Sequence, residues 1–200
     1  MKKIFYVFIA LTLCVLSCYA DKKEDKKNKE SKTVIDNILS RVSVRQFTVQ
    51  KVEQEKINII LKAAMAAPSG MNLQPWEILV VNDKNKLEAV AQAAPNAKYC
   101  TDSSLTIIVC GDTKTSEKLW IQDCCAVTEN ILLAAHSQGL GAVWCMCYPA
   151  QDKVADVQKI FNLPKHVIPL SIIPIGYPDR ELEPKKKFNS DKIHINGWNN

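Results

Sequence analysis

The most apolar stretch of the chain, residues 117–138, predicts a helix at the centre of the fold. Apolar residues cover far more of this stretch than the single stripe that an amphipathic surface helix shows. Acidic Glu117 near its start and Gly139 directly after its end favour a helix over a buried strand, because glycine commonly adopts the left-handed conformation after a helix. We therefore expect a long buried helix against which the other elements pack.

Two polar residues, Asp123 and Asn130, interrupt this apolar stretch two helical turns apart, and so lie roughly on one face of the helix. If they are buried, each needs a hydrogen-bond partner, since an unsatisfied polar group costs about 1–3 kcal/mol. We expect both side chains to bond neighbouring backbone and to fix the packing, rather than to act in catalysis.

The rest of the domain alternates between helical and extended patterns. Apolar residues at helical spacing predict helices at residues 33–40, 53–67, 84–94 and 152–161. Apolar runs predict strands at residues 76–82, 104–111, 142–148 and 167–177. Pro169 and Pro174 suggest an edge position or irregular pairing for the last strand, because proline cannot donate a hydrogen bond to a sheet ladder.

The N-terminal residues 1–20 predict an export signal. Lys2 and Lys3 precede an apolar run that ends at Leu16 and is shorter than the ~20 residues of a membrane-spanning helix. Residues 15–18 (VLSC) resemble a bacterial lipobox, which would make Cys18 the lipid anchor of an exported protein of the cell envelope. Ordinary signal cleavage near residue 20 is the alternative. Residues 21–32 lack apolar side chains and predict a charged flexible tether before a domain at 33–200.

Charge and cysteine usage exclude two kinds of site. The net charge of +5 comes mostly from the leader and tether, and no nucleic-acid-binding face is expected on the nearly neutral domain. The domain's cysteines form no CxxC pair at zinc spacing, so we expect core thiols and no metal site, although export would permit disulfides. These cysteines are Cys100, Cys110, Cys124, Cys125, Cys145 and Cys147.

Residues 41–47 (RVSVRQF) offer a candidate anion site. Their period of two places Arg41, Ser43 and Arg45 on one side of an extended segment. Two guanidinium groups and one hydroxyl suit a phosphate dianion, and a solvated charged strand is the alternative explanation.

A polar loop between Pro68 and Pro75 is a second candidate site. Its hydroxyl and amide groups can bind a ligand, and Gly70 would let that ligand approach the backbone closely. A plain connector into the next strand is the alternative. Neither a Ser/His/Asp order, nor HExxH, nor GxGxxG is readable, so we name no catalytic residue and expect a bound cofactor to carry any catalysis.

Five segments, taken in order, resemble the nitroreductase family of flavoenzymes: SRVSVRQF, APSGMNLQPW, WIQDCCAVTENILLAA, GLGAVW and IPIGYPDRELEPKKKF. The resemblance covers residues 33–195. It implies an α+β fold in which helices flank a central mixed sheet. It also implies a homodimer with helices exchanged across a large interface, and FMN bound there in two equivalent sites.

The resemblance assigns two groups of cofactor-binding residues. The phosphate and ribityl end of FMN would be held by Arg41, Val42, Ser43, Arg45, Lys185 and Lys187. Lys187 stands where the family usually has an arginine, and Lys185 is a second candidate for that role. The ring and its polar edge would be approached by Pro68, Ser69, Gly70, Asn72, Trp144, Cys145 and Met146, the first three from the partner subunit. The run from Cys145 to Cys147 replaces the small polar residue and glycine that are common in relatives.

The implied function is two-electron reduction of a nitroaromatic or quinone-type acceptor by NADH or NADPH. In the implied ping-pong mechanism, the donor and the small-molecule oxidant occupy the same place in turn, and side chains only position and polarise the rings. Export conflicts with this donor, because nicotinamide cofactors are scarce outside the cell. The alternative is a membrane-tethered flavoprotein that carries electrons or binds a ligand without turning over NAD(P)H.

Overall fold

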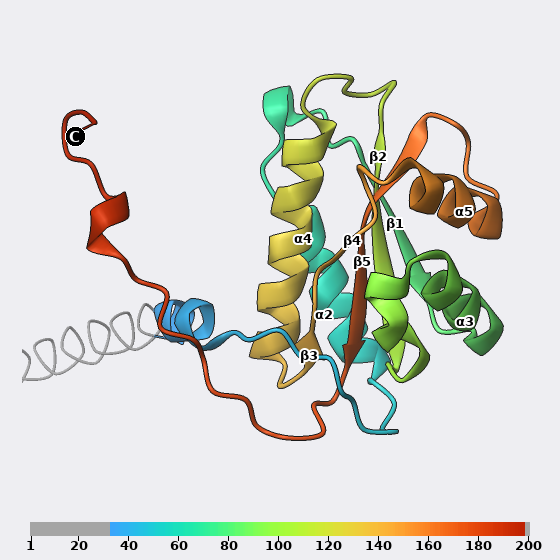
Figure 1. Cartoon of the computed structure of the whole chain (residues 1–200), viewed down its shortest axis with the longest axis horizontal. Helices are drawn as coiled ribbons and strands as arrows, with labels where there is room; N and C mark the ends of the chain where they lie inside the picture. Colours follow the sequence, from blue (N-terminus) through green and yellow to red (C-terminus); the bar gives the residue numbers. More distant parts are fainter. Residues whose placement is uncertain (1–32, 199–200) are drawn as a thin grey trace, which may run out of the picture. The chain divides into compact units, whose positions relative to one another are not determined.

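The computed structural model describes residues 33–198, whose contacts divide the chain into two units (Figure 1). In the first unit, residues 33–40 are helical as expected, and Ser40 Oγ donates a hydrogen bond to the main-chain oxygen of Asp36 at 2.6 Å. The expected export signal and tether lie outside the described residues. Within residues 33–198, no helix combines the length and apolar character that crossing a bilayer requires.

A five-stranded sheet forms the centre of the second unit, residues 41–200. The strand order is β1 (Trp76–Val81), β2 (Leu105–Asp112), β5 (Val167–Gly176) and β3 (Gly141–Ala142), and β4 (Cys145–Met146) also pairs with β5. These strand pairs are antiparallel, and a parallel bridge between Ser43 and Ala142 makes the sheet mixed.

The strand β5 lies inside the sheet, so the suggested edge position was wrong. Pro169 lies opposite Cys110, where the register shifts at a bulge between Val109 and Cys110. The bulge lets the ladder continue past a residue that has no N–H group. The irregular pairing that the prolines suggested is therefore confirmed at this position.

The strand expected at residues 142–148 is interrupted. Ala142 pairs with Ile175 and Cys145 pairs with Ile172, so β3 and β4 share one register along β5. Continued through the gap, that register places Val143 opposite Pro174, whose nitrogen cannot donate to the ladder. The break in this strand is thus explained by a residue on the neighbouring strand.

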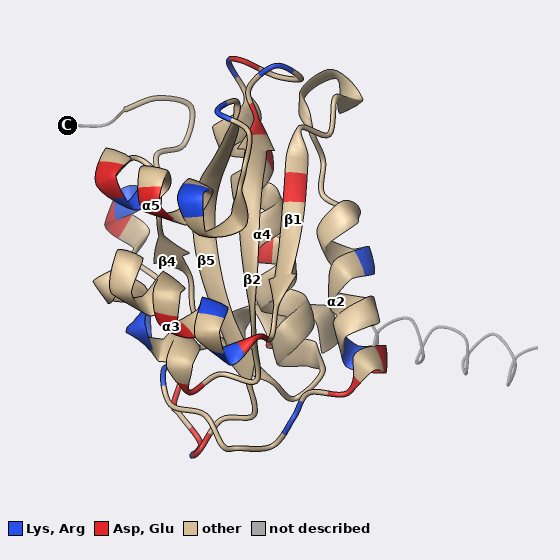
Figure 2. Ribbon diagram, turned by 90° about the vertical axis from the view of Figure 1, so that its right-hand side faces the viewer, with Lys and Arg blue, Asp and Glu red and all other residues tan. Residues whose placement is uncertain are grey.

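Helices cover both faces of the sheet, giving the expected α+β architecture (Figure 1). The helices α2 (Gln54–Met65) and α4 (Trp120–Ser137) pack on one face, and α3 (Lys84–Ala93) and α5 (Gln151–Phe161) pack on the other. Successive residues of β2 serve the two layers: Ile107 faces α2 and α4, whereas Ile108 faces α3 and α5. Figure 2 shows charges of both signs interspersed on α3 and α5.

The helix α4 confirms the predicted central helix and its end. Leu140 N donates to Ala135 O at 2.9 Å, and Gly139 N donates to His136 O at 3.0 Å, with Gly139 at φ +73°. This pair of hydrogen bonds is the Schellman motif, which satisfies the last carbonyls of a helix. Asn130 Nδ2 donates to the main-chain oxygen of Ala63 at 2.9 Å, the structural role expected for it.

The six cysteines of the domain are free, which confirms the expectation of core thiols. Cys125 is half-buried and the other five are buried. Burial raises the pKa of the Cys100 thiol to about 11 and the pKa values of Cys124, Cys145 and Cys147 to about 12. At neutral pH these thiols are protonated and are therefore weak nucleophiles.

Candidate functional site

An extended segment, residues 41–50, runs along the end of the sheet, and we call it the strap. Backbone hydrogen bonds hold it: Val44 N donates to Ala142 O at 3.0 Å, and Thr48 N donates to Tyr177 O at 2.8 Å. Val44 is buried over Gly141, where a Cβ atom would lie 2.6 Å from the valine side chain. The predicted alternation is therefore present, with Val44 facing inward and Ser43 and Arg45 exposed.

A cavity of about 760 Å³ opens beside the strap. Its walls come from the strap, from the 3-10 segment η2 (Pro95–Thr101) and from the tail that follows β5. The cations that line it are Arg41, Arg45, Lys98, Arg180, Lys185 and Lys187, and the carboxylates are Asp102, Asp179 and Glu183. The cations outnumber the carboxylates, so the cavity suits an anionic ligand.

Every arginine of the chain lines this cavity: Arg41, Arg45 and Arg180. Arginine presents a planar fork of donors that matches phosphate and carboxylate oxygens, whereas lysine is a point charge. The concentration of this side chain at one place favours bidentate recognition of an anion. Residues 33–198 contain no cluster of three His, Cys, Asp or Glu side chains placed to hold a metal ion.

Arg41 is the most enclosed cation of the strap, with its side chain 17% exposed. Its Nε lies 3.7 Å from Oε1 of Glu129 on α4, which orients the guanidinium. Burial and the charge of Arg41 together lower the pKa of His136 on the same helix. The guanidinium carbon of Arg45 lies 5.9 Å from the centre of the Tyr99 ring, within cation–π range.

The cavity brings together the phosphate-end residues that the sequence predicted. Arg41, Val42, Ser43, Arg45, Lys185 and Lys187 all line it. Sequence reasoning missed Lys98, Tyr99 and Arg180. Arg180 belongs to a segment already quoted for the resemblance, whereas Lys98 and Tyr99 lie on η2, where no pattern in the sequence marked them.

The loop residues of the second predicted group lie elsewhere in this chain. Pro68 and Ser69 precede the short segment η1 (Gly70–Asn72), and Gly70 N donates to Oδ1 of Asp123 in the first turn of α4 at 3.0 Å. The strap contacts the residues that follow the other end of α4, an 18-residue helix about 27 Å long. No residue of this loop lines the cavity of its own chain.

The remaining residues of the second predicted group, Trp144 to Met146, lie at β4 beside η2. Cys145 is buried, Trp144 is half-buried, and the Met146 side chain is 58% exposed. Asn96 Nδ2 on η2 donates to the main-chain oxygen of Met146 at 2.9 Å. Because η2 also carries Tyr99 of the cavity wall, this segment connects β4 to the cavity.

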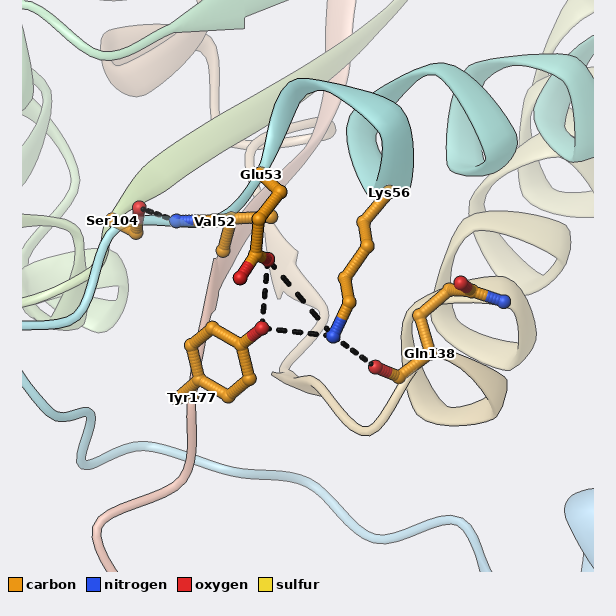
Figure 3. Close-up of polar contacts among 6 residues, drawn as sticks. All are labelled: Val52, Glu53, Lys56, Ser104, Gln138 and Tyr177. Carbon is orange, nitrogen blue, oxygen red and sulfur yellow. Dashed lines mark hydrogen bonds and ion pairs between the residues drawn. The ribbon is translucent and has the colours of Figure 1, made fainter.

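A polar cluster fixes the end of β5, from which the cavity-lining tail departs (Figure 3). Lys56 Nζ donates to the Tyr177 hydroxyl at 2.8 Å, and that hydroxyl donates to Oε2 of Glu53 at 2.7 Å. Lys56 Nζ also donates to the main-chain oxygen of Gln138 at 2.9 Å, which ties this cluster to the end of α4. Tyr177 precedes Asp179 and Arg180 of the cavity wall, so the cluster holds one wall in place.

Known proteins resemble this chain in sequence and in structure. A protein of Methanothermobacter thermautotrophicus, provisionally named NADH dehydrogenase/NAD(P)H nitroreductase, is 41% identical over 168 residues, covering 82% of this chain and 87% of its own length. A crystal structure from Bacteroides thetaiotaomicron, provisionally given the same name, is 47% identical with a TM-score of 0.81, covering 83% of this chain and 98% of its own. The FMN-dependent nitroreductase of Clostridium difficile is 29% identical with a TM-score of 0.78, and covers 82% of this chain and 99% of its own.

These relatives correct the expectation of an exported, membrane-anchored lipoprotein with a lipid at Cys18. The curated relatives of Methanothermobacter thermautotrophicus, Archaeoglobus fulgidus and Salmonella typhimurium are named for NADH- or NADPH-dependent reactions, and none of these three names describes an exported or lipid-anchored protein. A nicotinamide donor is scarce outside the cell, so the family's chemistry opposes export. The expected localisation was wrong because it rested on a short apolar run and a four-residue resemblance to a lipobox, and both lie outside the described residues.

The nitroreductase family model matches residues 38–100 and 101–177. The matched residues include the strap, the loop before β1, the central helix α4 and the strand β5. They also include four of the five segments from which the resemblance was drawn, and residues 173–177 at the start of the fifth. The chain belongs to the nitroreductase family.

Proposed function

We propose that the protein transfers two electrons from NADH or NADPH to a nitroaromatic or quinone-type acceptor, with FMN as its bound cofactor. The oxidoreductase class follows from the family, and FMN and NAD(P)H are the cofactors for which its relatives are named. The observation that carries the FMN assignment is the cavity that gathers every arginine of the chain.

The cavity fits the phosphate end of FMN in size and in charge. Its volume of about 760 Å³ lies within the range of small-molecule sites. A phosphate monoester carries a charge close to −2 at neutral pH and accepts several hydrogen bonds. We assign Arg41 as its fork donor, Ser43 as a neutral donor, and Lys185 and Lys187 as point charges. The ion pairs among residues 33–198 join Arg41 to Glu129 and Lys56 to Glu53, and neither Lys185 nor Lys187 takes part in them, so both charges are available.

Bound FMN would supply the two-electron redox centre between NAD(P)H and the acceptor. The protein's part is to place the ring and to stabilise negative charge on it. Arg45 of the strap and Lys98 of η2 line the cavity. Their positive charges would stabilise the negative charge that the flavin gains on reduction. The Cys145 thiol, with its pKa raised to about 12, stays neutral there, so we assign it packing and no nucleophilic role.

We also propose that the site is completed in a homodimer. The loop with Ser69, Gly70 and Asn72 does not line the cavity of its own chain, so we assign it to the flavin of a second copy. Large apolar side chains support such an interface: in the tail, Phe188 is 86% exposed and Trp198 is 80% exposed. Exposed apolar groups of this size typically mark an interaction surface. Donor and acceptor would then use the same face of the ring in turn.

A comparison of FMN with riboflavin tests this proposal, since the two share a ring and differ by the phosphate. We expect the wild type to bind FMN at least about tenfold more tightly, because charge-assisted hydrogen bonds contribute about 1.5–3 kcal/mol each. Arg41→Ala should weaken FMN binding by about tenfold to a hundredfold and change riboflavin binding little.

Lys159→Ala, which removes an exposed cation at the end of α5, is the matched control and should bind FMN as the wild type does. Equal affinities of the wild type for FMN and riboflavin would contradict the phosphate assignment. Failure to bind either flavin would overturn the proposed function as a whole.

A further inference from the structure

We infer that Asp123 is a positioning residue, which fixes the loop of residues 68–74 in the shape that it presents to the second copy's flavin site. This inference rests on the proposed function, because that proposal places the loop against a bound flavin. It adds a residue of α4 that sequence reasoning had assigned to packing alone.

The contact between Asp123 and the loop is buried and close. Asp123 is only 6% exposed, and its Oδ1 accepts a hydrogen bond from Gly70 N at 3.0 Å. Gly70 lies directly against Leu119, since a Cβ atom on this glycine would lie 2.4 Å from Cδ1 of the leucine. The loop backbone is therefore pressed onto the head of α4, with the carboxylate as its polar contact there.

The loop has a backbone shape that needs such support. Met71, Asn72 and Gln74 have φ values of 52°, 56° and 50°, a left-handed region that residues other than glycine rarely adopt. Such conformations persist where the surroundings fix them, and they concentrate at functional sites. Gln74 N donates to Ser69 Oγ at 3.0 Å, and Gln74 Nε2 donates to Asn72 Oδ1 at 2.9 Å, so the loop is braced internally.

Packing alone does not require a carboxylate at position 123. Its second oxygen, Oδ2, is buried and has no hydrogen-bond partner among the described residues. An asparagine could accept from Gly70 N without burying a charge. The charge strengthens the hydrogen bond to that amide, and it lies in the first turn of α4, where the helix dipole favours an anion. Asp123 therefore holds the loop more firmly than a neutral acceptor would.

The Met71 and Asn72 side chains are exposed, so the braced loop presents them outward. A loop that has lost its anchor would place these groups less well against a bound acceptor. The expected consequence is a higher KM for the acceptor, with little change in kcat or in FMN affinity, because the phosphate is held by the separate cavity.

The test measures reduction of 1,4-benzoquinone by the FMN-loaded protein, with whichever of NADPH and NADH the wild type uses as donor. We expect KM for the quinone to rise about threefold in Asp123→Asn and about tenfold or more in Asp123→Leu, in the order of hydrogen-bond strength. Thr128→Val is the matched control. It removes another buried polar group of α4, whose hydroxyl lies 2.9 Å from Ser171 Oγ, and it should lower stability without raising KM.

Hydrogen exchange supplies a second readout that does not depend on turnover. Exchange of the amides of residues 70–74 should accelerate in Asp123→Asn, but not in Thr128→Val. If Asp123→Leu does not fold, the comparison of Asp123→Asn with Thr128→Val still tests the positioning role of Asp123. This inference alone would be overturned if Asp123→Asn kept the wild-type KM and the wild-type exchange rates. It would also be overturned if Thr128→Val raised KM as much as Asp123→Asn does. A wild type without flavin-dependent turnover would overturn the proposed function and this inference with it.

Discussion

Lys56 Nζ lies 2.8 Å from the Tyr177 hydroxyl, and through this contact the start of α2 meets the end of β5 (Figure 3). The hydrogen bond that Tyr177 donates to Glu53 lowers the pKa of that carboxyl, and the contact with Tyr177 raises the pKa of Lys56. The tail that lines the cavity begins directly after this cluster. Breaking the contacts among Glu53, Lys56 and Tyr177 should therefore disturb the cavity as well as the fold.

Tyr177→Phe removes only the hydroxyl that joins Lys56 to Glu53. We expect Tyr177→Phe and Lys56→Met each to lower the Tm and to weaken FMN binding. Because both act on one network, the double variant should lose little more than the more damaging single change. Thermal unfolding and FMN titration of the wild type, the two single variants and the double variant measure these losses. Fully additive losses would contradict a shared network.

Gly111 gives a sharper test of packing, because it lies under the Trp120 ring. A Cβ atom there would lie 2.3 Å from Cε3 and 2.9 Å from Cδ2 of the indole, which itself packs edge-on against Tyr148. Gly111→Ala should therefore cost about 1–3 kcal/mol of the free energy of unfolding, as overpacking does. Gly197→Ala, where nothing lies within 4 Å, should be nearly neutral in the same urea titration. Similar effects of the two substitutions would contradict this packing.

His136 predicts a pH dependence of stability. Burial, followed by the Arg41 charge, lowers its pKa below the ordinary value of 6.5. The folded state therefore binds fewer protons than the unfolded state when the pH falls below about 6.5, and stability is lost in that range and not above it. His136→Gln should flatten the fall in unfolding free energy between about pH 7 and pH 5. An unchanged pH slope in the variant would contradict the lowered pKa.

The cysteines should differ in reactivity according to burial. Cys125 is half-buried, whereas Cys100 and Cys145 are buried with pKa values raised to about 11 and about 12. Among the six cysteines of residues 33–198, iodoacetamide should label Cys125 first in the folded protein, and mass spectrometry of the peptides resolves each site. In urea the rates should converge. Rapid labelling of Cys145 in the folded state would show that β4 is more open than its burial indicates.

The sequence predicted those parts of the fold in which a single segment determines its own structure. The central helix α4 and the buried strand β2 were recognisable because their apolar residues must be covered whatever surrounds them. The break between β3 and β4 was not, because it depends on Pro174 across the sheet. The exposure of Met65 on α2 was not predictable either, because the partner surface we propose lies outside a single chain.

The candidate site likewise contains residues that one segment of the sequence predicts and residues that only the fold brings together. Arg41, Ser43 and Arg45 were predictable because a period of two places them on one side of one segment. Lys98 and Tyr99 reach the cavity only because η2 packs beside β4 and the strap, a juxtaposition that local patterns do not encode. The unpartnered oxygen of Asp123 likewise became apparent only once the loop was placed against α4.

The central claim is that this chain uses FMN to pass electrons from a nicotinamide cofactor to an acceptor. It is tested most directly by an anaerobic absorbance spectrum of the purified, FMN-loaded protein before and after addition of NADPH or NADH. We predict that the absorption of oxidised flavin is lost on addition of the donor and returns when 1,4-benzoquinone is added. A flavin band that neither donor changes would indicate a carrier or ligand-binding protein, and a protein that binds no FMN would contradict the claim.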